Sequence, residues 1–145
     1  MIKRIFNAIT LVWVVMLSSC TALFDEDKLV GDPWYLSKVI YYDSNDEEVE
    51  YVYPSEDVKL KFYYDGALSI LSTGVDHFGY IYEDWVDGEW SYEEDFLTLY
   101  TPNGNYEYEL EELTSWKLVL SYYYEVEEFS GVWSTYRVEE IYSRE

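Results

Sequence analysis

The chain has 145 residues, of which 30 are acidic, nine are Lys or Arg and one is His, and its formal net charge is −21. This length suits a single domain, and a field this negative repels nucleic acid and anionic lipid surfaces. Because hydrophobic residues make up 49% of the chain and aromatic residues 21%, we expect a folded domain and not a disordered one.

The first nineteen residues have the pattern of a removable signal peptide. Lys3 and Arg4 precede an apolar run that ends at Leu17 and is followed by two serines, which is the order of a secretory signal. The run of about 13 residues is shorter than the roughly 20 that a transmembrane helix needs. We therefore expect residues 1–19 to be a signal peptide, of the lipoprotein type because a cysteine follows it directly.

Residues 17–20, Leu-Ser-Ser-Cys, are similar to the lipobox of bacterial lipoproteins. The resemblance implies that Cys20 is acylated, for example by palmitate, and becomes the first residue of the mature chain. Cys20 is also the single cysteine of the chain, so it has no intrachain disulfide partner. More than one acyl chain gives stable membrane attachment.

The implied location is the bacterial cell envelope, at the periplasmic face of the outer membrane or at the cell surface. The alternative is an ordinary signal peptide with an incidental cysteine.

Removal of the signal would make the protein more acidic. Lys3 and Arg4 would be lost while all 30 acidic residues remain, which leaves a net charge of −23. These acids can keep an aromatic-rich β protein soluble and protect its strand edges; a dedicated cationic partner is the alternative. We expect residues 20–28, which include three consecutive acids, to form the lipidated cysteine and an acidic tether. Residues 29–145 would then form the folded domain.

From Leu29 onward the pattern favours strands throughout, and we expect no helix anywhere in the mature chain, residues 20–145. The clearest strand is 58–64, in which apolar side chains alternate with two lysines. Asp65-Gly66 then predicts a hairpin into 67–72. A second hairpin is predicted between 96–101 and 106–110, whose residues alternate with glutamates.

The other predicted strands are 34–42, 49–53, 78–83, 88–92, 116–126 and 132–142, with irregular loops at 72–77 and 84–88. Eight to ten strands joined by short turns must bury one face and leave no unpaired edges. Closure of the sheet into a barrel achieves both. We therefore predict an all-β protein, an antiparallel meander that closes into a barrel of about eight strands, with a two-layer β-sandwich as the alternative.

Several short motifs resemble those of the lipocalin-like domains of bacterial lipoproteins. They are Leu29-x-Gly31-x-x-Trp34-x-Leu36, Asp65-Gly66, Gly88-x-Trp90, Leu97-Thr98-Leu99, Leu110-x-x-Leu113-Thr114 and Leu118-x-Leu120. The chain departs from the family pattern at Asp32-Pro33, where a single residue is usual. The resemblance spans Leu29 to Tyr142 and implies an eight-stranded barrel whose interior or mouth holds a small apolar molecule.

Alternation along the predicted strands selects eight inward-facing residues as candidates to line a ligand site. They are Val58, Leu60, Phe62, Leu68, Ile70, Tyr108, Leu118 and Leu120. Our leading hypothesis is a membrane-tethered lipocalin-like barrel that binds a small hydrophobic ligand without catalysis. The alternative for the same residues is a filled core with no room for a ligand.

The aromatic residues suggest a second hypothesis. Tyr123 should face the opposite way from its neighbours Tyr122 and Tyr124, and Trp85 lies in an expected loop. Exposed aromatic side chains of this kind can stack on sugars or contact a protein. The second hypothesis is therefore a cell-surface interaction module that contacts a glycan or a protein through Trp85 and Tyr123.

The residue types argue against an enzyme or a metal site. His77 is the single histidine, and no Gly-x-Ser-x-Gly elbow exists, so a nucleophilic triad has no support. One histidine and one lipidated cysteine cannot supply the usual zinc ligand sets. Asp43 to Glu48 offers oxygen atoms but lacks the glycine and distal glutamate of an EF-hand, and a solvated hairpin turn explains it better. We expect no catalytic residue, no metal and no cofactor.

Overall fold

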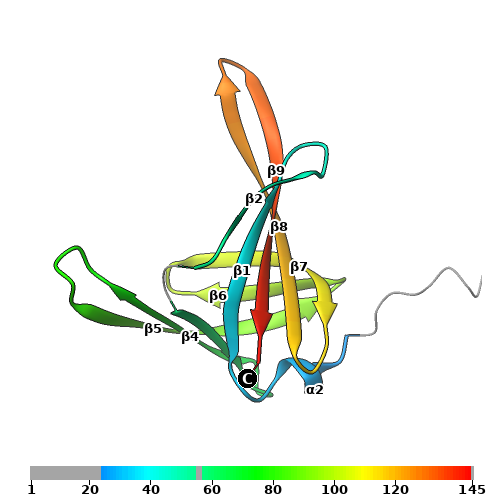
Figure 1. Ribbon diagram of the computed structural model, residues 1–145. Coiled ribbons are helices and arrows are strands. Elements are labelled where there is room, and N and C mark those ends of the chain that lie inside the picture. The colour runs from blue at the N-terminus through cyan, green and yellow to red at the C-terminus, as the bar shows by residue number, and fades with distance from the viewer. Residues whose placement is uncertain (1–23, 55–56, 145) are drawn as a thin grey trace, which may run out of the picture.

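The computed structural model describes residues 24–54 and 57–144. In this part of the chain a short helix, α2 (Glu26–Leu29), precedes nine strands. The strands are β1 (Trp34–Tyr42), β2 (Glu48–Val52), β3 (Asp57–Phe62), β4 (Ala67–Val75), β5 (Ile81–Glu93), β6 (Phe96–Thr101), β7 (Gly104–Leu113), β8 (Lys117–Phe129) and β9 (Val132–Ser143). Figure 1 shows their arrangement.

The strands form a closed antiparallel barrel, as the sequence predicted. From β3 to β9 each strand pairs with the next along the chain, and β9 pairs back with β1. β1 pairs with β3 near its start, at Trp34 and Leu60, and with β2 farther along, at Val39 and Val52. The barrel therefore consists of eight strands, β1 and β3 to β9, and β2 pairs with the second half of β1. The two-layer sandwich is not the architecture.

β5 corrects the expectation of two strands separated by a loop at 84–88. It runs without a break from Ile81 to Glu93, and residues 84–88 all pair with β4. A Cβ atom on Gly88 would lie 2.2 Å from the carbonyl oxygen of Tyr100, so this glycine lets the backbone of β6 approach closely. The expected loop at 72–77 is also mostly strand, because β4 extends to Val75.

The one-turn helix α2 corrects the expectation of no helix. Asp25 caps it by accepting a hydrogen bond from the backbone N–H of Asp27, and Leu29 at its end is buried. Phe24 stacks on Tyr92 with ring centroids 3.8 Å apart, so residues expected in the tether contact the barrel. α2 lies at one end of the barrel (Figure 1). Within the described ranges, no helix is long and apolar enough to cross a membrane.

The hydrophobic core fills the end of the barrel next to α2. Its buried side chains include those of Leu29, Trp34, Phe62, Leu68, Trp90, Leu97, Leu118 and Leu120. The indole N–H of Trp34 donates to the carbonyl oxygen of Leu29 at 2.8 Å, and that of Trp90 donates to Tyr63 O at 3.0 Å. Large side chains of this kind contribute about 1.5–3 kcal/mol each to the stability of the fold when buried, so they stabilise the end of the barrel next to α2.

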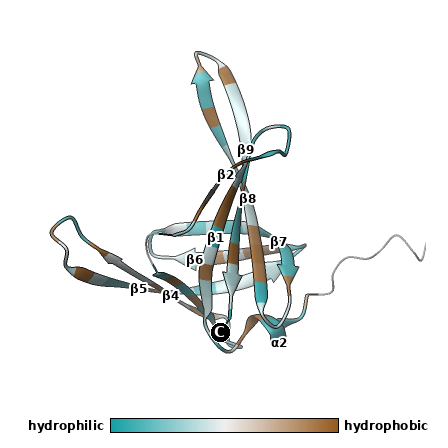
Figure 2. Cartoon of the chain, in the orientation of Figure 1, coloured by the Kyte–Doolittle hydropathy of each residue, from teal (hydrophilic) through white to brown (hydrophobic). Residues whose placement is uncertain are grey.

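Two long hairpins, β4–β5 and β8–β9, project beyond the barrel (Figure 1). Their tips expose large apolar side chains, Phe78 and Ile81 on the first and Phe129 and Trp133 on the second. Figure 2 shows apolar segments on both projecting hairpins as well as in the barrel. The exposed apolar side chains of the tips are therefore separate from the core.

Candidate functional site: the barrel cavity

A cavity of about 320 Å³ occupies the part of the barrel beyond the core. Its apolar wall comes from alternate residues of five strands, namely Leu36, Val58, Leu60, Ile70, Val86 and Leu99. Polar residues follow toward the other end of the barrel, where Asn103 and Tyr106 line the cavity and are exposed. The cavity therefore opens at the end opposite α2.

Strand register explains why the cavity changes from apolar to polar toward its mouth. Side chains on one face of a strand are two residues apart, so inward-facing residues of β3, β4 and β5 form successive rows. These rows are Phe62, Leu68 and Gly88, then Leu60, Ile70 and Val86, and then Val58, Ser72 and Asp84. The first row belongs to the core, the second is the apolar wall, and the third includes the polar mouth.

The eight candidate lining residues divide into two groups. Val58, Leu60, Ile70 and Tyr108 line the cavity. Phe62, Leu68, Leu118 and Leu120 are fully buried in the core below it. All eight lie inside the barrel, because alternation determines the face of a strand. Alternation does not determine the height along the barrel axis, which separates core from cavity.

Glu140, on β9, is a lining residue that sequence reasoning missed. Its Oε2 accepts a hydrogen bond from the Tyr142 hydroxyl at 2.7 Å. Burial raises the pKa of Glu140, and this hydrogen bond opposes that shift. Because the chain has 30 acidic residues, the sequence does not distinguish this glutamate from those on the surface. The signal available in the sequence was its spacing of two from Tyr142, which places both on one face of the strand.

Three tyrosines surround this carboxyl group. Tyr108 and Tyr122 form an edge-to-face pair with ring centroids 5.7 Å apart, and Tyr142 is 3% exposed. Burial, with the Glu140 charge as the next cause, raises the pKa of Tyr122 to about 12 and raises those of Tyr108 and Tyr142 further. The phenols therefore stay protonated at neutral pH, and that of Tyr142 donates to Glu140.

Trp85 lies in an outer groove of about 300 Å³, on the opposite face of the barrel wall from the cavity. Tyr35, Lys59, Leu71 and Trp85 are successive cross-strand neighbours there. The Lys59 ammonium lies 5.0 Å from the centroid of the Tyr35 ring. Trp85 itself is 61% exposed. The groove thus combines aromatic rings with positive charge.

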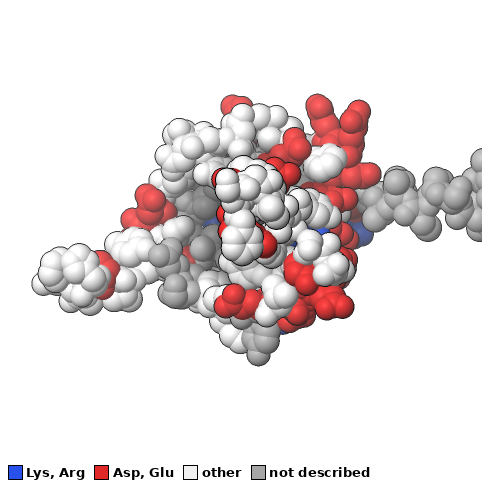
Figure 3. Space-filling view, turned by 90° about the horizontal axis from the view of Figure 1, so that it is seen from above, with Lys and Arg blue, Asp and Glu red and all other residues white. Residues whose placement is uncertain are grey.

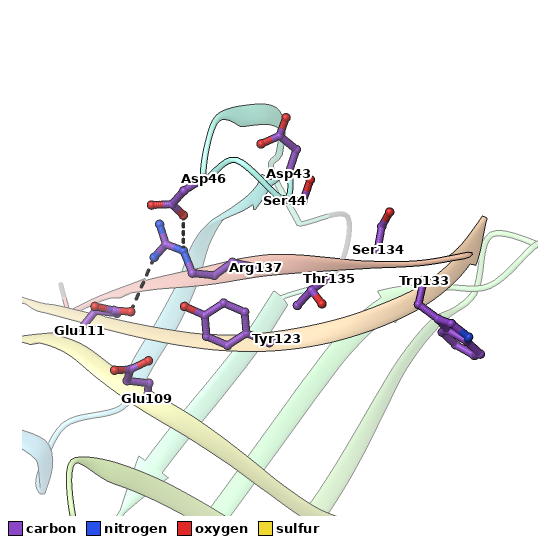
Figure 4. A pocket seen from close by; sticks show the side chains of 10 residues that line it. All are labelled: Asp43, Ser44, Asp46, Glu109, Glu111, Tyr123, Trp133, Ser134, Thr135 and Arg137. Carbon is purple, nitrogen blue, oxygen red and sulfur yellow. Dashed lines mark hydrogen bonds and ion pairs between the residues drawn. The ribbon is translucent and has the colours of Figure 1, made fainter. Parts of the chain in front are cut away.

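Tyr123 lines a different outer groove, of about 690 Å³, between the β1–β2 turn, β7 and the β8–β9 hairpin. Figure 4 shows its ring beside Arg137, with Asp46 and Glu111 on the other sides of the guanidinium. Arg137 Nε donates to Asp46 at 2.9 Å, and Nη1 donates to Glu139 at 2.6 Å. The two predicted surface residues, Trp85 and Tyr123, are therefore not brought together.

Other residues singled out in the sequence lie away from the cavity. Asp43 accepts the backbone N–H groups of Asn45 and Glu47, which closes the β1–β2 turn, and these hydrogen bonds lower the pKa of Asp43. His77 packs against Phe78 with ring centroids 3.8 Å apart.

The described residues contain no cluster of three or more His, Cys, Asp or Glu side chains that could hold a metal ion. Cys20 lies outside the described residues.

Solved structures share this architecture. A lipocalin-like protein from Bacteroides uniformis is 17% identical with a TM-score of 0.50, and the match covers 81% of this chain and 99% of that one. The chain therefore has a lipocalin-like fold. Lobster apocrustacyanin A1 matches at 15% identity and a TM-score of 0.52, with 83% of this chain and 63% of that chain covered. Apocrustacyanin C1 matches at 17% identity and a TM-score of 0.53, with the same coverage.

These identities establish the fold alone. The lipocalin-like fold agrees with what the sequence motifs implied. No protein-family model matches the sequence, and no curated protein matches it. These comparisons assign no ligand to the barrel.

Proposed function

We propose that this protein is a membrane-tethered, non-enzymatic binding protein whose lipocalin-like barrel holds a small, mainly apolar ligand. The supporting observation is the open cavity of about 320 Å³ with six aliphatic side chains in its wall. A cavity needs only about 10–15 Å³ of such volume to hold one water molecule, so the side chains leave this part of the barrel open. The volume lies at the lower end of the roughly 300–1,000 Å³ of small-molecule sites, which favours a small ligand.

The proposed lipid anchor at Cys20 fits the orientation of the barrel. Phe24 contacts the barrel through Trp90 and Tyr92, and α2 follows it at the closed end (Figure 1). Because Cys20 precedes Phe24 by four residues, an acyl anchor there would hold the closed end toward the membrane. The cavity mouth would then face away from the membrane and accept ligand from the aqueous side.

A cavity-filling substitution tests ligand binding. The described residues form a closed barrel with its own core, so the chain from residue 21 onward is a suitable sample. N-phenyl-1-naphthylamine, a neutral apolar dye, should bind with increased fluorescence. Ile70→Trp, on the cavity wall, should abolish this signal. Leu71→Trp adds the same ring to the outer face of the same strand and should bind like the wild type.

Two outcomes would contradict a binding cavity. The first is a wild-type protein that gives no fluorescence change at saturating dye. The second is equal binding by the Ile70→Trp and Leu71→Trp variants, which would place the dye on the surface. Cleavage or chemical modification of a bound ligand would argue against the non-enzymatic part of the proposal.

The groove at Trp85 supports a second candidate function, contact with an acidic glycan at the cell surface. Lys59 and Lys61 line the groove and form no ion pair with an acidic residue of the described chain. Figure 3 shows acidic side chains gathered on one side of the molecule, whereas the projecting β4–β5 hairpin is mostly uncharged. A sugar ring stacked on Trp85 would place its carboxylate or sulfate near the two ammonium groups.

Affinity electrophoresis can test this second function. Polygalacturonate should retard the wild-type protein more than neutral dextran does, and Trp85→Ala should remove the difference. Trp116→Ala is a matched control, because Trp116 is 70% exposed and lies outside the groove. Tyr123→Ala tests the other groove in the same way. Equal mobility of the wild type and Trp85→Ala in polygalacturonate would exclude the groove as the contact.

A further inference from the structure

The charge of the cavity is of one sign. Fourteen described residues line it, including the acids Asp84 and Glu140, and none of the fourteen is Lys, Arg or His. The basic residues of adjacent strand positions face elsewhere. Lys59 and Lys61 line the outer groove, and Arg137 pairs with acids on the outer surface. Among the described residues, therefore, no Lys, Arg or His lines the cavity to balance these carboxylates.

Glu140 keeps hydrogen-bonding capacity that the described residues do not use. Tyr142 donates to its Oε2, whereas its Oε1 accepts no hydrogen bond from another described residue. A carboxylate can accept about four hydrogen bonds. Tyr108 and Tyr142 line the same cavity as Glu140, and the ring of Tyr122 packs edge-to-face against that of Tyr108. A donor that enters the cavity can therefore reach a partly buried, incompletely paired acceptor.

A protonated amine is the ligand group that fits these surroundings best. A buried carboxylate loses hydration, and an ion pair with hydrogen bonds offsets that loss. Tyrosine rings also attract a cation within about 6 Å, and Tyr108 and Tyr142 line the cavity together with Glu140. A ligand carboxylate would instead add a negative charge beside Glu140 and Asp84. The same cavity therefore disfavours a fatty acid.

We propose that the barrel binds a small apolar molecule that ends in a protonated amine, with the amine at Glu140 and the apolar body against Leu60, Ile70 and Val86. This inference rests on the proposed function, because it requires the cavity to bind a ligand. It adds the chemical class of the ligand and the residue that recognises it. The competing explanation is that Glu140 only anchors the Tyr142 hydroxyl.

Three probes of equal chain length separate these explanations. n-Octylamine, 1-octanol and octanoate present a cation, a neutral hydroxyl and an anion on the same apolar chain. Each is titrated against the dye-loaded protein at neutral pH and about 0.15 M salt, where exposed charges are largely screened beyond about 8 Å. We expect octylamine to displace the dye at a concentration at least about tenfold lower than octanol does. Octanoate should be the weakest.

Two variants of adjacent residues provide a matched comparison. Glu140→Gln should lower octylamine affinity to that of octanol and leave octanol binding unchanged. Glu139→Gln removes the same charge one position away, where the side chain contacts Arg137 and Tyr42 outside the cavity. It should leave all three affinities unchanged. Loss of octylamine binding in both variants would mean that net charge alone attracts the amine, which would overturn the proposal.

A charge-introducing variant keeps the test valid if Glu140→Gln does not fold. Ser72→Lys places an ammonium group on the cavity wall and should weaken octylamine and strengthen octanoate. If octanol displaces the dye as well as octylamine does, the cavity binds ligands but the amine proposal is wrong. If none of the three probes displaces the dye and the dye itself does not bind, the proposed function fails as well.

Discussion

The Arg144 guanidinium lies over the ring of Trp34, with its central carbon 3.9 Å from the ring centroid. It also donates hydrogen bonds to four carbonyl oxygens at the end of α2 and just beyond it, those of Lys28, Leu29, Val30 and Asp32, at 2.6 to 3.1 Å. Since Trp34 itself donates to Leu29, one arginine joins the last residues of β9 to the start of β1 and to α2. This contact closes the end of the barrel that carries the core.

Arg144→Lys should lower the free energy of unfolding by about 2–3 kcal/mol. A lysine retains the charge but not the planar set of donors that reaches several carbonyl oxygens at once, and hydrogen bonds from charged groups are worth about 1.5–3 kcal/mol. Urea unfolding followed by tryptophan fluorescence measures the change. Lys117→Ala is the control, because its exposed ion pair with Glu112 is of a kind worth about 0–1 kcal/mol. Equal losses in the two variants would refute the special role of Arg144.

Glu140→Gln should stabilise the fold increasingly as pH rises. Burial raises the pKa of Glu140 in the folded state. The contribution of this group to stability is therefore fully present below the unfolded pKa of about 4.3 and is lost as pH rises through the folded value. The surrounding Tyr108, Tyr122 and Tyr142 stay neutral in this range, because burial raises their pKa.

Thermal unfolding from pH 4 to pH 8 measures this difference. The unfolding temperatures of the wild type and Glu140→Gln should be similar near pH 4 and should diverge toward pH 8, with the variant higher. Because both chains share all the other carboxylates, the difference isolates Glu140. A constant difference across the range would mean that Glu140 is not desolvated. A carboxylate kept at the cost of stability is expected where it binds a ligand.

The strand pattern predicted which residues face inward but not where the barrel is hollow. On β3, alternation correctly separated Val58, Leu60 and Phe62 from the two outward lysines. Leu60 and Phe62 lie on the same face of β3 and both belong to the buried core cluster, yet only Leu60 also lines the cavity. That difference depends on the closing contacts of α2 and Arg144, which are far apart in sequence. No local period encodes them.

Two errors in the predicted elements also have physical reasons. Asp84 and Asp87 suggested a loop, because acidic residues are depleted in strands. In the folded chain Asp84 lies at the cavity mouth, and Asp87 accepts the Ser69 hydroxyl on the outer face at 2.9 Å, so both are compatible with β5. α2 has four residues, which is too short for a helical period to appear.

Gly88→Ala should destabilise the barrel by at least about 2 kcal/mol. The added Cβ would lie 2.2 Å from the Tyr100 carbonyl oxygen, and a backbone atom cannot rotate away as a side chain can, so β5 and β6 must separate. Glu89→Ala, on the next residue of β5, is the control and should change stability by less than about 0.5 kcal/mol. Chemical denaturation measures both variants. A Gly88→Ala protein as stable as the wild type would show that the two strands are farther apart than described.

Two substitutions that shorten a side chain to alanine should distinguish the core-filled end of the barrel from its cavity. Leu120→Ala removes a fully buried core side chain and should cost about 2–5 kcal/mol, since it leaves a void in packed surroundings. Ile70→Ala, on the cavity wall, should lower the free energy of unfolding by less. The part of the Ile70 side chain that faces the cavity makes no packing contacts that the substitution could remove. Ile70→Ala also enlarges the cavity and should preserve dye binding. If the two substitutions cost the same, Ile70 packs against core on every side, and the ligand site proposed for this barrel would not exist.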